Sequence, residues 1–228
     1  MAAVLLINAP YTDYTQPYHS LSYVSAPLKK AGFDVDVIDL NIEWFRYLFN
    51  SETLSRWQQH LEEELDRLEN ITDWCIDIQI RVTKTAQCLS IAREIDPERA
   101  IDIFKSDRFY DYAQYLEAQS CVTNFERLLE YFHPSYAYFT AFKSPAAEPN
   151  MRDLVAGILD SEQFIQDVSD ILTSRFGEKE YLFCGVSIPF YGCARLGFAA
   201  LQAARNVFSS ALLVAGGTAV TDLYKNRL

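Results

Sequence analysis

Short apolar runs occupy the two ends of the chain, and helical periodicity occupies its middle. The runs lie at residues 3–9, 34–39, 182–188 and 211–216, and each has the length of a β-strand. A helical run that ends near Asn206 joins the last two. Because parallel neighbours need a crossover connection, these three segments predict one right-handed β-α-β unit. We expect a parallel sheet in the strand order 2-1-3-4.

The segment between the first two runs predicts a second crossover helix. Apolar residues recur at helical spacing over residues 21–31, and Gly32 follows in the position of a helix C-cap. Residues 33–39 then alternate apolar and acidic side chains, a pattern typical of a strand at the edge of a sheet. Asp39 ends this run and Asn41 follows it, and we expect both to cap the following helix rather than to bind a ligand.

Residues 42–176 predict a helical insertion. No glycine occurs between Phe33 and Asn150, and turn signals such as Asp96-Pro97 and His133-Pro134 divide the segment into five or six helices. Only residues 136–142 could form a strand. The fold class is therefore α/β, a doubly wound sheet of the flavodoxin-like or Rossmann-like kind, mostly parallel, built from residues 1–41 and 177–228. The insertion either covers the ligand face or packs on a neighbouring domain.

Composition and charge exclude several classes of partner. The 228 residues carry a formal net charge of -11 and are 50% hydrophobic, and no cluster of Lys and Arg offers a nucleic-acid surface. The apolar N-terminal run is too short for a signal peptide or a membrane span. Five cysteines lie scattered without metal-ligand spacing, which is typical of reduced thiols in a cytoplasmic protein.

Candidate binding residues fall at the ends of the predicted strands. Ser187 ends the third strand and Gly216-Gly217 end the fourth, where ligands bind in doubly wound sheets. The loop after the first strand, residues 11–20, lacks a glycine-rich phosphate-binding turn, so a dinucleotide fingerprint is absent. A crossover without any ligand remains the alternative on this spacing alone.

The motifs at both ends resemble a known family. Gly-Val-Ser-Ile-Pro-Phe at residues 185–190, Leu-Val-Ala-Gly-Gly-Thr at 213–218 and Leu-Leu-Ile-Asn-Ala-Pro at 5–10 look like the cobalamin-binding-like domain that precedes the catalytic barrel of B12-dependent radical SAM enzymes. The resemblance implies that cobalamin binds at the carboxyl edge, with its nucleotide tail between the first and third strands. The residues that it implies are Asn8, Pro10, Ser187, Pro189, Gly216, Gly217 and Thr218.

Within that resemblance, Ser187 would hydrogen-bond the nucleotide tail, and the two glycines would let the tail approach the strand end. Leucine at position 217 would then abolish corrinoid binding and leave the fold intact. The histidine that replaces the lower axial base in other cobalamin domains is missing at Asp13-Tyr14-Thr15. His19, later in the loop, is an ordinary helix-entry residue in our interpretation.

The cluster motif Cys-x-x-x-Cys-x-x-Cys of radical SAM enzymes is also missing. The 4Fe-4S cluster and S-adenosylmethionine would belong to a C-terminal radical SAM domain. We expect this chain to be the truncated N-terminal partner of that domain, and the whole enzyme to act on an unidentified small molecule or peptide. Cobalamin binding by the isolated chain should be weak. Two alternatives stay open, a cofactor-free version of the fold that recognises substrate or docks on the catalytic domain, and a flavodoxin-like nucleotide binder.

Overall fold

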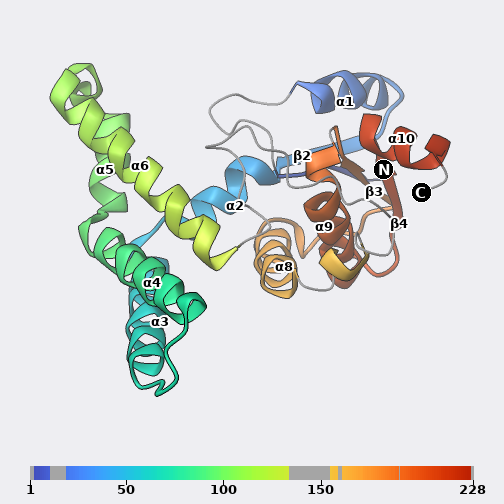
Figure 1. Ribbon diagram of the computed structural model, residues 1–228. Helices are drawn as coiled ribbons and strands as arrows, with labels where there is room; N and C mark the ends of the chain where they lie inside the picture. The colour runs from blue at the N-terminus through green and yellow to red at the C-terminus, as the bar shows by residue number, and fades with distance from the viewer. Residues whose placement is uncertain (1–2, 11–18, 134–154, 159–160, 190, 227–228) are drawn as a thin grey trace. The chain divides into compact units, whose positions relative to one another are not determined.

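The computed structural model describes residues 3–10, 19–133, 155–158, 161–189 and 191–226. Four parallel strands form one sheet in the order β2-β1-β3-β4 (Figure 1). The predicted strands and their order are thus confirmed, and β2 does lie at an edge. The strands are β1 (Ala3–Asn8), β2 (Asp34–Asp39), β3 (Phe183–Ser187) and β4 (Leu212–Gly216).

Contacts between Cα atoms divide the chain into two compact units. The first comprises residues 1–47 and 135–228 and contains the sheet, and the second comprises residues 48–134. Helix α8 (Glu162–Phe176) and all but the last residue of α2 (Leu40–Leu48) belong to the first unit, whereas the sequence pattern grouped them with the insertion.

Helices cover the sheet of the first unit from both sides. Helix α1 (Ser20–Lys30) follows β1 and contacts β1 and β2, whereas α9 (Ala194–Val207) contacts β3, β4 and α8. Figure 1 shows α1 on one side of the sheet and α8 and α9 on the other. Right-handed crossovers impose this arrangement, because the connection from β1 leads to β2 at one edge of the sheet and the connection from β3 leads to β4 at the other. The short 3-10 helix η3 (Tyr191–Cys193) leads into α9, and α10 (Thr218–Asn226) follows β4.

The parallel register decides which side chains share a face of the sheet. Val4 pairs with both Val35 and Phe183, and Phe183 pairs with Leu212, so these four side chains point to the α1 face. Val4, Val35 and Leu21 of α1 form a buried cluster there. Leu5, Ile7, Cys184 and Val186 alternate with the first set, and all four are buried on the face of α8 and α9.

Helix α2 is fixed to α8 by a buried polar contact. The Trp44 indole Nε1 donates a hydrogen bond to Asp167 Oδ2 at 3.0 Å, and the Trp44 ring packs edge-on against Phe164 at 4.9 Å between centroids. Trp44 is 1% and Asp167 4% exposed. The contact joins residues 123 positions apart, and it ties the segment after β2 to the helix that leads into β3.

The described residues of the second unit form helices joined by short turns, without a strand. Its elements are α3 (Ser51–Glu69), α4 (Ile76–Glu94), α5 (Pro97–Lys105), the 3-10 helix η1 (Asp107–Tyr110) and α6 (Tyr112–Phe132). Asn50, Asp96 and Asp111 cap α3, α5 and α6 by accepting backbone N–H bonds. The turn predicted at Asp96-Pro97 is confirmed as a helix boundary, and α6 ends at Phe132 with His133 as its C-cap residue. The strand considered for residues 136–142 lies outside the described residues.

An aromatic core holds these helices together. Trp57 of α3 stacks on Phe125 and Phe132 of α6, with centroids 5.2 and 4.6 Å apart. Leu61, Leu128 and Leu129 are fully buried beside them. Across the described part of the chain, every helix is too short or too polar to cross a bilayer.

Candidate functional site

The last residues of the four strands form one row across the carboxyl edge of the sheet. Asp39 pairs with Asn8, Asn8 with Ser187, and Ser187 with Gly216. Side chains in one row of a parallel sheet point to the same face, here the face of α1. The row crosses the position between β1 and β3 where the connections leave in opposite directions, which is where doubly wound sheets bind ligands. It is therefore the candidate functional site.

The half of the row at β2 is closed. Asn8 is fully buried, and its Nδ2 donates to Asp39 Oδ1 at 3.0 Å. The same carboxylate oxygen accepts the backbone N–H of Asn41 at 3.0 Å, so Asp39 caps α2 as the sequence predicted. These contacts fix the Asn8 amide relative to the end of β1 and hold the first turn of α2 against the sheet.

The central part of the row contains hydroxyl groups. Ser187 is half-buried, and its Oγ lies 3.4 Å from Ser20 Oγ, at the first position of α1. The Ser187 carbonyl accepts the backbone N–H of Ala9 at 3.2 Å, so β1 and β3 stay paired one residue beyond the row. Two serine hydroxyls from segments far apart in sequence thus meet beside β1. Either can donate to a ligand, because a hydroxyl rotates to suit its acceptor.

The half of the row at β4 is open, and its two glycines differ. A β-carbon built on Gly216 meets no atom within 4 Å, whereas one on Gly217 would lie 2.4 Å from the Ile188 carbonyl oxygen. Gly217 also has φ of +114°, which side chains disfavour. Gly217 therefore serves the backbone turn. We therefore expect leucine at position 217 to disturb the fold, unlike the expectation from the sequence, and Gly216 is the position that borders open space.

The other residues implied by the resemblance follow the ends of β1, β3 and β4, and they differ in burial. Pro10 and Pro189 are buried and follow β1 and β3 by two residues each. Thr218 is exposed at the start of α10. His19 is the N-cap residue of α1, and its side chain makes no capping hydrogen bond. Residues 13–15, where the axial histidine is missing from the sequence, lie outside the described residues.

Ser20 and Asp39 were not among the predicted site residues. Asp39 ends a predicted strand, and this position could have marked it as a site residue. The sequence favoured a helix-capping role for Asp39 instead, and this role is confirmed. Ser20 carries no signal in the sequence, because a serine at a helix start is common and its proximity to Ser187 arises only from the pairing of β1 with β3.

Apart from the Asp39 carboxylate, which caps α2, the row offers neutral hydrogen-bonding groups. Across the part of the chain that the structure describes, His, Cys, Asp and Glu form no group able to hold a metal ion. Burial raises the pKa of the Cys184 thiol to about 11, so Cys184 of β3 stays a protonated core residue. The arrangement can bind a polar, uncharged or phosphate-containing moiety through its hydroxyl groups, and its one carboxylate, Asp39, is engaged by Asn8 and by the backbone of Asn41.

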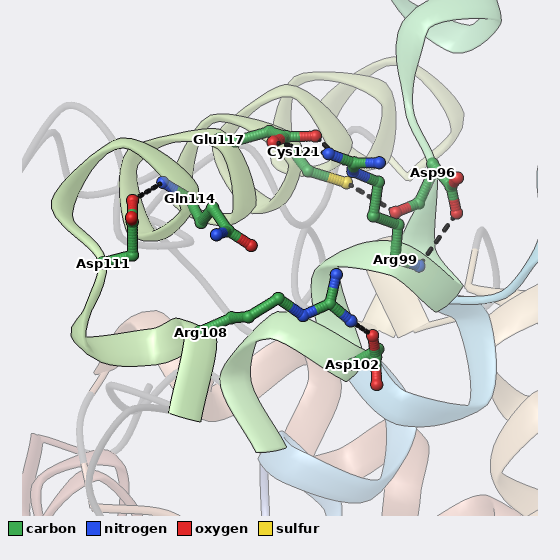
Figure 2. Close-up of polar contacts among 8 residues, drawn as sticks. All are labelled: Asp96, Arg99, Asp102, Arg108, Asp111, Gln114, Glu117 and Cys121. Carbon is green, nitrogen blue, oxygen red and sulfur yellow. Dashed lines mark hydrogen bonds and ion pairs between the residues drawn. The ribbon is translucent and has the colours of Figure 1, made fainter. Parts of the chain in front are cut away.

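A second polar region lies in the helical unit, at a cavity of about 230 Å³ between α5 and α6. Figure 2 shows that its polar groups are engaged with one another. Arg99 pairs with both carboxylate oxygens of Glu117, and the Asp96 carboxylate caps α5. Cys121 donates to the Asp96 carbonyl at 3.5 Å, and burial raises the pKa of its thiol. Each of these polar groups thus stabilises the packing or capping of α5 and α6.

Comparison with known proteins adds no further constraint. The chain matches no family model, no curated protein and no solved structure. The fold and the geometry of the carboxyl edge are thus the observations from which function is argued.

Proposed function

We propose that this chain is a corrinoid-binding module of the kind found at the N-terminus of B12-dependent radical SAM enzymes. The observation that carries the proposal is the row Asn8, Ser187 and Gly216 at the carboxyl edge. The row lies where such sheets bind ligands, and position 216 borders open space. The motif resemblance at both ends of the chain supports the same assignment.

The residues of the row fit the nucleotide tail of cobalamin. Ser187 and Ser20 supply hydroxyl donors beside β1, and Gly216 lets a bulky group approach the end of β4 without meeting a side chain. When bound, the corrinoid would supply methyl-transfer or related radical chemistry. This chain's own residues would bind and orient the tail, since Asp39, the one carboxylate of the row, is engaged by Asn8 and by the start of α2.

A 4Fe-4S cluster and S-adenosylmethionine do not fit these residues. Three cysteines with cluster-binding spacing are absent from the sequence. Of the five thiols, Cys88, Cys184 and Cys193 are buried. In the proposed enzyme both groups belong to a C-terminal radical SAM domain, which is the proposed partner, and the substrate is a small molecule or a peptide.

We expect this chain to bind cobalamin weakly by itself. In the proposed enzyme the corrin ring lies between the sheet edge and the catalytic domain, so one face of the ring stays in water when that domain is absent. At about 25 cal/mol per Å², an uncovered face of a few hundred Å² forgoes several kcal/mol, or roughly three or more powers of ten in affinity. The test must therefore detect weak binding.

Equilibrium dialysis against hydroxocobalamin, read by the corrin absorption band, provides that test. We expect saturable binding by the wild-type chain and at least tenfold weaker binding, about 1.4 kcal/mol, by Gly216→Leu. Ser210→Leu is the matched control, because residue 210 is exposed at the opposite end of β4. Absence of saturable binding, or equal binding by Gly216→Leu and wild type, would contradict the proposal.

The second candidate is a cofactor-free version of the fold that docks on a catalytic domain or recognises its substrate. The observation that favours it is an exposed apolar surface on the α1 face, which includes Leu182 and Leu212. If hydroxocobalamin fails to bind, this candidate gains support.

A further inference from the structure

We draw no further inference here: the strongest candidate, the exposed apolar patch of Trp74, Ile76 and Ile80 at the turn between α3 and α4 and the start of α4, carries none because nothing in the structure shows what covers it.

Discussion

Gly197 of α9 lies directly against the buried side chain of Ile188, the residue that follows β3. A β-carbon at position 197 would lie 2.7 Å from Ile188 Cγ1 and 3.2 Å from its Cγ2. Both atoms are attached to the same β-carbon of Ile188, so no single rotation moves both away. The absent side chain at position 197 therefore sets how closely α9 approaches the chain segment that leads from β3 to the candidate site.

We predict that Gly197→Ala destabilises the protein. Alanine in a helix interior gains about 0.5–1 kcal/mol over glycine, but forcing a methyl group into a filled core costs about 1–3 kcal/mol. We expect a net loss of about 1 kcal/mol in the free energy of unfolding, measured by urea denaturation. Gly192→Ala is the control, because a β-carbon there meets no atom within 4 Å. Equal stability of the two variants would contradict the argument.

The second prediction concerns the Trp44–Asp167 hydrogen bond. Asp167→Ala leaves the buried indole N–H without this acceptor, and the loss of a buried hydrogen-bond partner costs about 1–3 kcal/mol. Asp170→Ala, three residues along the same helix, is exposed and should change stability by less than about 0.5 kcal/mol. Both changes alter helix propensity equally, so the difference between them reports the buried contact. Denaturation followed by tryptophan fluorescence measures it.

The sequence predicted the sheet because its signals are local. Apolar runs of strand length, a C-cap at Gly32 and alternation in residues 33–39 each depend on neighbours in sequence, and right-handed crossovers leave few orders for four parallel strands. Gly32 indeed has φ of +89° after α1. The edge position of β2 followed from its acidic alternation.

What the sequence did not predict depends on contacts between distant residues. Trp44 and Asp167 are 123 positions apart, so nothing local indicated that α2 and α8 pack together beside the sheet. Ser20 meets Ser187 only through strand pairing. The two glycines at 216 and 217 look alike in sequence, and only the position of the Ile188 carbonyl separates the backbone role of one from the open space at the other.

The third prediction concerns acid stability and Asp36 of β2. Burial raises the pKa of Asp36, but hydrogen bonds from Lys179 at 2.7 Å and Tyr181 at 2.6 Å, with the charges of Lys179 and Lys29, outweigh it, so its pKa lies below the ordinary 3.8. The unfolded chain therefore binds the proton first. The stability that Asp36 contributes is fully present above about pH 4 and is lost as the pH falls through the lowered pKa.

Asp36→Asn should accordingly be less stable than wild type at neutral pH, and the difference should shrink as the pH falls below 4. Asp34→Asn is the matched control, because Asp34 is exposed and lies 3.8 Å from the same Lys179 Nζ. Thermal denaturation at several pH values measures both. A difference between Asp36→Asn and wild type that stays constant on acidification would contradict the assignment.

The fourth prediction concerns His133, at the end of α6. Burial lowers its pKa to about 4 from an ordinary 6.5, so between these values the unfolded chain binds a proton that the folded chain excludes. The free energy of unfolding should fall with decreasing pH across this window, by up to about 1.4 kcal/mol per pH unit. His133→Gln should remove that slope, and His60→Gln, at an exposed histidine, should retain it.

The last prediction separates the two glycines at the end of β4. Gly217→Ala places a methyl group 2.4 Å from the Ile188 carbonyl oxygen at φ of +114°. A strained backbone alone costs about 1–3 kcal/mol, so we expect a large loss of stability together with displacement of the segment after β3. The β-carbon that Gly216→Ala adds meets no atom within 4 Å, so the free energy of unfolding of this variant should lie within about 0.5 kcal/mol of the wild-type value. If Gly216→Ala instead unfolds the chain, the row borders no open space, and the ligand site proposed at the carboxyl edge loses its central observation.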